Sequence, residues 1–246
     1  MASAARMIAR NPRLDGRRVG LIVPSVNATI EPELAWAAPP GLSFHAARVM
    51  LRETTPDGLR AMNAEAAAAA DLIASVSPDV VAYACTSGTF LDGRDGLERL
   101  VAGLQARVGC PVVATSAAMV DALRAVGVRR VALATPYLDA VNELERAFLE
   151  EQGFEVVRVR GLGLSGRAIR EVPPDRVHAL ACSADTPSAD GVFVSCTDLR
   201  ALETVDSVER TLGKPVVTSN QATLWAVLRA LGHRPIVEGF GRLLRT

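Results

Sequence analysis

The sequence predicts an α/β protein of two similar lobes, each a doubly wound parallel sheet, related by a pseudo-two-fold axis. Three observations support this prediction. Short apolar runs alternate with segments of helical periodicity along the chain. The runs are apolar throughout, which is typical of strands covered by helices on both faces. The pattern also restarts after Gly127, as expected of an internal repeat.

Residues 18–127 form the predicted first lobe. Its strands are expected at residues 18–25, 42–50, 79–85 and 111–116. Pro56 to Val76 is expected to form one helix, because Thr55 is a good N-cap residue and Pro56 suits a first helical turn. The last helix of this lobe is able to pack on the other lobe.

Residues 128–246 form the predicted second lobe, with strands at 129–136, 154–161, 191–196 and 215–220. Two segments of it match the first lobe. VGCPVVATSAAMVDALRAVG resembles LGKPVVTSNQATLWAVLRALG, and DVVAYACTSGTF resembles DGVFVSCTDLRA, which sets Cys85 opposite Cys196. Because parallel sheets bind ligands at the carboxyl ends of their strands, we expect both cysteines to line one active site in the cleft between the lobes.

The composition excludes several classes of partner. Twenty-seven Lys and Arg balance 27 Asp and Glu, so no positive field attracts nucleic acid or a membrane surface. No apolar run approaches the roughly 20 residues that cross a bilayer. The N-terminal MASAARMIARNPRLDGRR lacks the apolar centre of a secretory signal, so a cytoplasmic location is expected. The four cysteines lack zinc-site spacing, and no glycine-rich nucleotide loop follows a strand, so neither metal nor nucleotide cofactor is expected.

The residues alone leave two interpretations of Cys85 and Cys196 open. Cysteine is commonly a small hydrophobe of the core, and that interpretation suits Cys110 and Cys182. Cys85 and Cys196 instead each end an apolar run and precede a threonine and a polar turn toward a helix. A thiol in that position receives backbone N–H donors and the positive end of the helix dipole, which favour a reactive thiolate.

Five segments together carry a resemblance to a known family: GLIVPSVNATIEPE, YACTSGTF, ATPYLDAVNE, VSCTDLR and PVVTSNQATLWAVLRALG. They resemble the aspartate/glutamate racemase superfamily and are most similar to its maleate cis-trans isomerase group, with arylmalonate decarboxylase as a relative. The resemblance implies two α/β lobes with one catalytic cysteine each, no metal, no organic cofactor, and a homodimer or homotetramer acting on a small dicarboxylate.

The resemblance also implies a role for each thiol. In the isomerases the first-lobe cysteine adds to the substrate double bond and the second transfers a proton, which makes Cys85 the nucleophile and Cys196 the acid and base. The decarboxylases have glycine at the first position, so two cysteines argue against simple decarboxylation. A racemase or decarboxylase acting on an amino acid or a substituted malonate is the alternative, and a binding protein for a small acid ranks last.

Uncharged donors are expected to hold the substrate carboxylates. The candidates lie at the ends of successive strands: Ser25, Asn27, Thr86, Ser87, Tyr137 and Thr197. Ser25 and Asn27 are also suited to shaping a turn before a helix. Two positions depart from the isomerases: Gly166 replaces an asparagine, where the adjacent Arg167 offers a carboxylate clamp, and Asp198 requires a cation such as Arg200.

Overall fold

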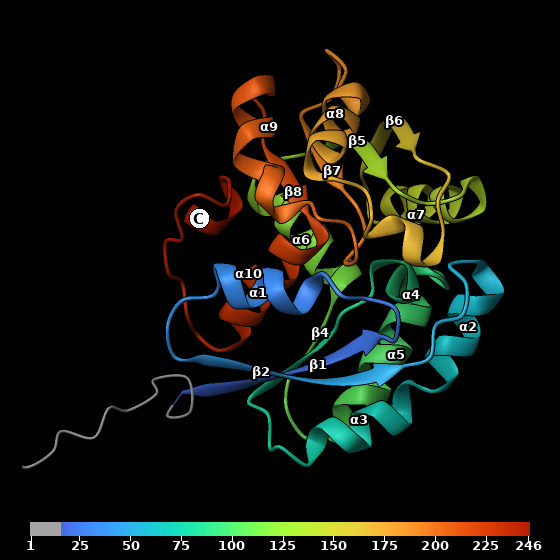
Figure 1. Ribbon diagram of the computed structural model, residues 1–246, viewed down its shortest axis with the longest axis vertical. Coiled ribbons are helices and arrows are strands. Elements are labelled where there is room, and N and C mark those ends of the chain that lie inside the picture. The colour runs from blue at the N-terminus through green and yellow to red at the C-terminus, as the bar shows by residue number, and fades with distance from the viewer. Residues whose placement is uncertain (1–15) are drawn as a thin grey trace, which may run out of the picture.

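The computed structural model describes residues 16–246 and consists of two lobes, each built on a four-stranded parallel sheet (Figure 1). The strand orders are β2-β1-β3-β4 and β6-β5-β7-β8, so the second sheet repeats the first. The predicted α/β fold of two similar lobes is confirmed. The prediction about a secretory signal concerns residues before 16, which lie outside the described residues.

The first lobe contains the blue-to-green elements of Figure 1. Its strands are β1 (Arg17–Pro24), β2 (Leu42–Val49), β3 (Val80–Tyr83) and β4 (Val112–Ala114). Its helices are α1 (Ile30–Ala37), α2 (Pro56–Ala64), α3 (Ala66–Ala74), α4 (Thr86–Phe90), α5 (Gly93–Val108) and α6 (Thr115–Ala125). The central strands β1 and β3 are almost wholly buried, because helices cover both faces of the sheet.

The second lobe repeats this arrangement. Its strands are β5 (Arg130–Thr135), β6 (Glu155–Gly161), β7 (Gly191–Val194) and β8 (Val216–Thr218). Its helices are α7 (Asp139–Glu151), α8 (Pro174–Ala184), α9 (Val205–Leu212) and α10 (Ser219–Ala230), with short 3-10 turns η1 (Gly166–Ile169), η2 (Leu202–Thr204) and η3 (Leu243–Arg245). Each of the eight strands lies where the apolar runs predicted it, ending within two residues of the expected bounds.

The predicted helix from Pro56 to Val76 is wrong in one respect, because the structure divides it into α2 and α3. The chain tightens at Glu65, whose N–H bonds to Met62 rather than continuing the helical ladder. The predicted cap is present, since the Thr55 hydroxyl accepts a hydrogen bond from the Gly58 N–H at 3.2 Å.

Helices α6 and α10 hold the two lobes together. They are equivalent in the repeat, they pack on each other, and each also contacts strands of both sheets. A hydrogen bond of 3.0 Å joins the Thr115 and Thr223 hydroxyls inside this contact. In Figure 1, α10 lies beside α1 of the first lobe, so the carboxyl ends of both sheets are fixed facing each other. Within residues 16–246, no helix is long and apolar enough to cross a bilayer.

Candidate active site

A small cavity lies where the carboxyl ends of the two sheets meet. Its volume is about 30 Å³, and both predicted cysteines contribute to its wall. The lining residues come from both lobes: Pro24, Val26, Asn27, Leu51, Thr54, Cys85, Thr86, Ser87, Tyr137, Gly166, Ile169, Cys196, Thr197 and Asp198. A larger groove of about 1110 Å³ lies elsewhere, on the outer surface of α5 and α6, and includes Cys110.

The cavity is small, with room for about one water molecule. Two loops meet over it, one after β2 and one leading into η1. The Thr54 N–H donates to the Ser165 hydroxyl at 3.1 Å, and the Gly166 N–H donates to the Thr54 hydroxyl at 3.3 Å. These two hydrogen bonds join the loops that carry Thr54 and Gly166 in the cavity wall.

Cys85 lies at the start of α4, directly after β3. Its sulfur accepts a hydrogen bond from the Gly88 N–H at 3.3 Å and lies 3.7 Å from the Ser87 hydroxyl. Burial raises the pKa of the thiol, and the hydrogen bonds from Gly88 and Ser87 oppose that rise. The pKa of Cys85 is raised overall, and the donors around the sulfur limit that rise because they stabilise the thiolate form.

Cys196 lies at the equivalent point after β7, but its backbone and surroundings differ. Its φ of 97° is in the region that disfavours residues other than glycine, so its conformation is strained. Its sulfur accepts a hydrogen bond from the Asp198 N–H at 3.4 Å. Burial, and then the Asp198 carboxylate, raise the pKa of this thiol far above its ordinary value, so Cys196 holds its proton.

Three of the predicted polar residues connect the lobes beneath the cavity. Asn27 donates to the Thr197 hydroxyl at 2.9 Å, and that hydroxyl donates to the Ala84 carbonyl at 3.1 Å. The side-chain oxygen Oδ1 of Asn27 also accepts from two N–H groups at the start of α1, so Asn27 shapes this turn as well. The Thr86 hydroxyl donates to the Ser219 hydroxyl at 2.8 Å. These bonds fix the two cysteines relative to each other.

Tyr137 lines the cavity beside Cys196 and is almost wholly buried. Burial raises the pKa of its phenol well above the ordinary value, so Tyr137 is a neutral donor at physiological pH. Its hydrogen bond lowers the pKa of the Cys196 thiol. Behind it, the Ser195 hydroxyl lies 3.5 Å from the Tyr137 oxygen and 2.6 Å from Glu145. The sequence analysis missed Ser195 and Glu145.

Asp198 places a carboxyl group in the cavity wall. One oxygen accepts a hydrogen bond from the Ala28 N–H at 2.8 Å, and the other has no partner among the described residues. Arg200, the expected cation, instead pairs with Glu203 at 2.9 Å. Arg170 is the cation that acts on Asp198; burial raises the pKa of this carboxyl, and Arg170 opposes the rise.

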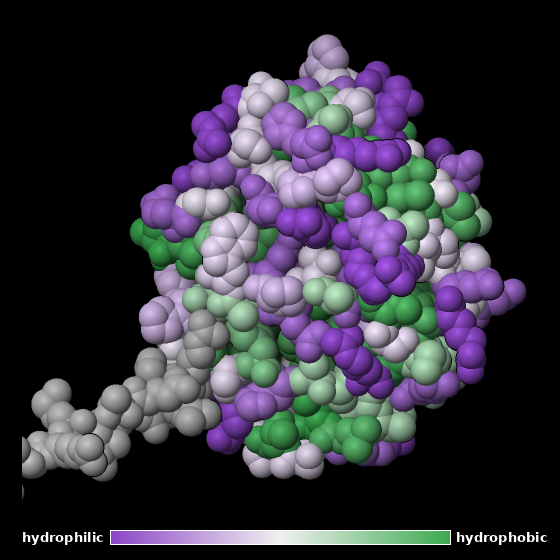
Figure 2. Space-filling view, in the orientation of Figure 1, coloured by the Kyte–Doolittle hydropathy of each residue, from purple (hydrophilic) through white to green (hydrophobic). Residues whose placement is uncertain are grey.

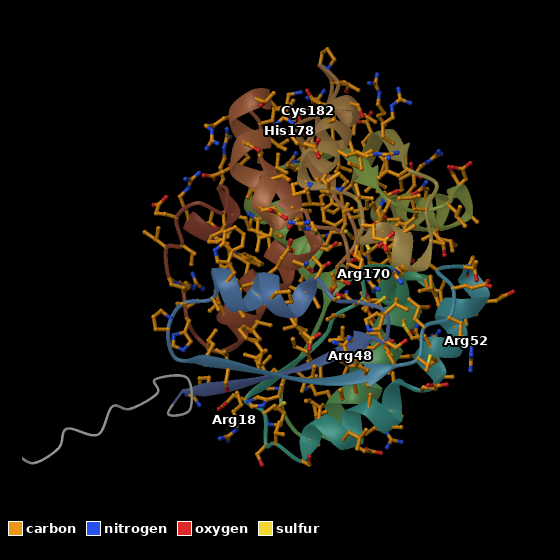
Figure 3. All side chains as sticks on the ribbon, viewed as in Figure 1. Arg18, Arg48, Arg52, Arg170, His178 and Cys182 are labelled. Carbon is orange, nitrogen blue, oxygen red and sulfur yellow. The ribbon has the colours of Figure 1, made fainter. Side chains whose placement is uncertain are left out.

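Arg170 and Arg48 hold the turn between β1 and α1 from the two lobes. Arg170 donates to the Val26 carbonyl, and Arg48 donates to the Asn27 carbonyl at 2.7 Å. Figure 3 shows Arg170 near the junction of the lobes and Arg48 in the first lobe below it. In Figure 2, hydrophilic side chains (purple) cross the same part of the surface.

The structure does not bring two of the predicted substrate-binding residues into the cavity. Arg167 follows Gly166 on η1, but its guanidinium points to solvent and pairs with Glu171 at 2.7 Å, because successive residues of a turn face different ways. Ser25 binds the loop after β2 through the Leu51 N–H, at 3.0 Å. Within residues 16–246, no three His, Cys, Asp or Glu side chains gather closely enough to hold a metal ion.

Known proteins are similar to this chain along nearly its whole length. The arylmalonate decarboxylase family model matches residues 19–244. The chain is 35% identical over 240 residues to a maleate isomerase of Nocardia farcinica, covering 93% of this chain and 96% of that protein. It is also 35% identical over 229 residues to the arylmalonate decarboxylase of Bordetella bronchiseptica, covering 92% and 95%.

Solved structures are similar along the same length. A cysteine-to-serine variant of the Nocardia farcinica maleate cis-trans isomerase, with a covalently bound succinylcysteine intermediate, superimposes with a TM-score of 0.89 at 32% identity. That match covers 93% of this chain and 98% of the other. A crystal structure of arylmalonate decarboxylase gives a TM-score of 0.78 at 33% identity, covering 92% and 98%.

Proposed function

This chain belongs to the arylmalonate decarboxylase family, and on that premise we propose that it is a cofactor-independent cis-trans isomerase of maleate or a similar cis-enedioate. One observation carries the proposal: Cys85 and Cys196, from opposite lobes, line the same small cavity. A similar isomerase that forms a succinylcysteine supports the covalent route.

The proposed reaction begins with the Cys85 thiolate. Its sulfur forms a bond to one alkene carbon, and the π electrons move to the other carbon and its carboxylate as an enediolate. The Cys196 thiol donates its proton to that carbon, which leaves a succinyl thioether on Cys85 and a thiolate at Cys196. Conjugate addition suits a thiolate, which is a soft nucleophile even at modest basicity.

The former double bond is now a carbon–carbon single bond, and rotation about it brings the two carboxylates from the cis to the trans arrangement. The Cys196 thiolate removes a proton from the carbon it protonated, the carbon–sulfur bond breaks, and the electron pair returns to Cys85. The trans alkene leaves, and both thiols regain their starting protonation states. Each proton and electron pair is accounted for within the two residues and the substrate.

The two sulfur environments support this division of roles. Cys85 has backbone and hydroxyl donors, whereas Cys196 lies beside the Asp198 carboxylate, which disfavours a second negative charge. We therefore expect Cys85 to be the more acidic thiol. Environments that push two titratable groups apart are typical of an acid and nucleophile pair. While Cys196 still holds its proton, Tyr137 and the Ser87 hydroxyl are the uncharged donors available to a substrate carboxylate.

The proposal extends to a cytoplasmic location, which the sequence predicts, and to a homodimeric or homotetrameric assembly, which the family resemblance implies. Light scattering after size-exclusion chromatography measures the assembly directly, and a monomer contradicts that part alone.

The test is proton NMR of the purified protein with maleate in deuterated buffer, beside Cys85→Ala and Cys196→Ala. Fumarate that forms with the wild type and with neither variant supports the isomerase. Maleate that stays unchanged overturns maleate as the substrate. Substituted malonates and amino acids are then the next probes, since released carbon dioxide or a changed enantiomer identifies the decarboxylase or racemase alternative.

A further inference from the structure

Glu145 is a buried acid that the proposed reaction does not use. It lies in the middle of α7 and is 0% exposed, whereas other acidic residues of that helix, such as Glu143 and Glu150, face solvent. One carboxyl oxygen lies 2.6 Å from the Ser195 hydroxyl, and the other has no partner among the described residues. A buried carboxyl group without a cation is costly, so its presence requires an explanation.

A chain of hydrogen-bonding groups connects Glu145 to Cys196. Glu145 contacts the Ser195 hydroxyl at 2.6 Å, and Ser195 lies 3.5 Å from the Tyr137 oxygen. Tyr137 lines the same cavity as Cys196, and its hydroxyl lowers the pKa of that thiol. Ser195 directly precedes Cys196, and Tyr137 lies just before α7. The four groups thus run in one line from the interior of the second lobe to the cavity.

The Ser195 hydroxyl decides which way this chain is polarised, because it has one proton and two neighbours. When Glu145 is a carboxylate, Ser195 donates to it at the short distance of 2.6 Å, and the Tyr137 hydroxyl is drawn toward Ser195. When Glu145 is protonated, it donates to Ser195, Ser195 donates to Tyr137, and Tyr137 donates to Cys196. Only the second arrangement directs every proton toward the sulfur.

We propose that Glu145 is a positioning residue that, when protonated, acts through Ser195 and Tyr137 to direct a hydrogen bond onto the Cys196 thiolate. This inference rests on the proposed role of Cys196, which becomes a thiolate once it has protonated the substrate carbon. A donor aimed at that thiolate stabilises the covalent intermediate, since hydrogen bonds to charged groups are the strong ones.

The surroundings of Glu145 are consistent with a neutral acid. Helix α4 has no charged residue, and the charged residues of α5 and β6 are all exposed. Arg94 of α5 binds Glu151 at the other end of α7, and Arg158 of β6 binds the Asp185 carbonyl. Tyr137 and Cys196 are the titratable groups on the chain that leads to the carboxyl group.

Burial raises the pKa of Glu145 to about 8, with the Ser195 hydrogen bond opposing the rise. The carboxyl group is therefore protonated at neutral pH and ionises as the pH rises through about 8. Above that pH the chain reverses and the new negative charge opposes the Cys196 thiolate. The effect is thus present at pH 6–7 and lost by pH 9–10, when Glu145 is ionised.

The experiment compares wild type with Glu145→Gln from pH 6 to pH 10, because a glutamine amide donates to Ser195 at every pH. Cys196 is 8% exposed, so its rate of reaction with the small reagent methyl methanethiosulfonate is followed by peptide mass spectrometry. The ratio of the variant rate to the wild-type rate is expected to be near one at pH 6 and to rise about tenfold by pH 10, the effect of one pKa unit. A flat ratio overturns the proposal.

Glu33→Gln is the matched control. Glu33 is also a buried acid with a pKa raised to about 8, but it bonds to Asn220 and the Leu202 N–H rather than to this chain. Its ratio is expected to stay flat. Ser195→Ala provides a second route if Glu145→Gln fails to fold: it breaks the chain, and Cys196 is then expected to lose its dependence on the ionisation near pH 8. A Ser195→Ala protein that keeps the wild-type profile overturns the proposal.

The thiol reaction needs no substrate, so the two proposals fail separately. Absence of maleate turnover overturns the isomerase and leaves the Cys196 profile to decide on Glu145. Where turnover occurs, kcat/KM for maleate gives a second readout. The wild-type value is expected to fall about tenfold relative to Glu145→Gln between pH 6 and pH 10.

Discussion

The two cysteine half-sites occupy matching places in the repeat and differ at each flank. The first reads ACTS at residues 84–87, and the second reads SCTD at residues 195–198. The residue before the cysteine changes from alanine to serine, and the second residue after it changes from a hydroxyl to a carboxylate. The backbone differs too, with a φ of −145° at Cys85 and 97° at Cys196.

This difference teaches how a repeated fold acquires an asymmetric site. The shared threonines, Thr86 and Thr197, each form a hydrogen bond to the opposite lobe. The residue that joins the lobes is therefore the same in both copies of the repeat. The flanking residues that differ are those that contact the sulfurs or the groups behind them. Ser87 opposes the rise in the pKa of Cys85, whereas Asp198, which raises the pKa of both thiols, ranks directly after burial only for Cys196. The proposed assignment of one nucleophile and one acid rests on this difference.

Replacing either thiol by a hydroxyl tests this comparison and has the largest expected effect on turnover. Both Cys85→Ser and Cys196→Ser are expected to lose about 10²–10⁴-fold in kcat for maleate, since each removes a group that acts in the reaction. Only Cys196→Ser is expected to retain an adduct of the mass of maleic acid, bound to Cys85. Intact-protein and peptide mass spectrometry measure it.

Cys110→Ser is the control, because Cys110 lies in the outer groove and is partly exposed. It is expected to keep wild-type turnover. An adduct on Cys196 in the Cys85→Ser protein would reverse the assigned roles and remove the basis of the comparison.

Asp198→Asn sharpens the comparison with a smaller effect. An asparagine keeps an oxygen for the Ala28 N–H. It also removes the negative charge of Asp198, which repels the substrate carboxylates by several kcal/mol at an effective dielectric constant near 20. KM for maleate is expected to fall by about tenfold or more. Steady-state kinetics at pH 7.5 measure it, and an unchanged KM shows that Asp198 does not repel the substrate.

Gly166→Asn adds the amide that the isomerase resemblance implies at this position. The backbone there has a φ of 56°, the left-handed region in which asparagine is the best-tolerated alternative to glycine, and a Cβ atom would meet nothing within 4 Å. KM for maleate is expected to fall several-fold through a new hydrogen bond. Arg167→Ala is the matched control on the same turn, and its KM should stay within about twofold because its guanidinium is exposed.

The fold and the pair of thiols were predictable from the sequence for physical reasons. Strands buried on both faces must be apolar throughout, so each strand is recognisable without an alignment. A cysteine at the end of such a strand lies at the carboxyl edge of the sheet, and the repeat fixes its counterpart. The directions of side chains on turns are not encoded in this way, which is why Arg167 was assigned to the cavity and Arg200 to Asp198.

Glu145 was missed although its signal lies in the sequence. It falls between Val141 and the Phe148–Leu149 pair on α7, at the spacing of the buried face of a helix. An acid within the apolar face of a helix is costly to bury and therefore a candidate functional residue, and here it bonds to the residue before Cys196. Ser195 carried no comparable signal, because a serine at the end of a strand is common in turns.

The two buried acids, one per lobe, give the prediction with the smallest expected effect. Glu33 on α1 accepts hydrogen bonds from Asn220 at 2.7 Å and from the Leu202 N–H at 3.3 Å. Burial nevertheless raises its pKa from 4.5 to about 8, as burial also does for Glu145.

The native state thus binds these two protons more tightly than the unfolded chain does. Their contribution to the free energy of unfolding is complete below about pH 4.5 and is lost as the pH rises through about 8. Thermal unfolding should show Tm falling over that window, with Glu33→Gln and Glu145→Gln each flattening about half of the slope. If Glu33→Gln leaves the slope unchanged, the Asn220 and Leu202 bonds hold Glu33 ionised, and only the acid of the second lobe titrates in this range.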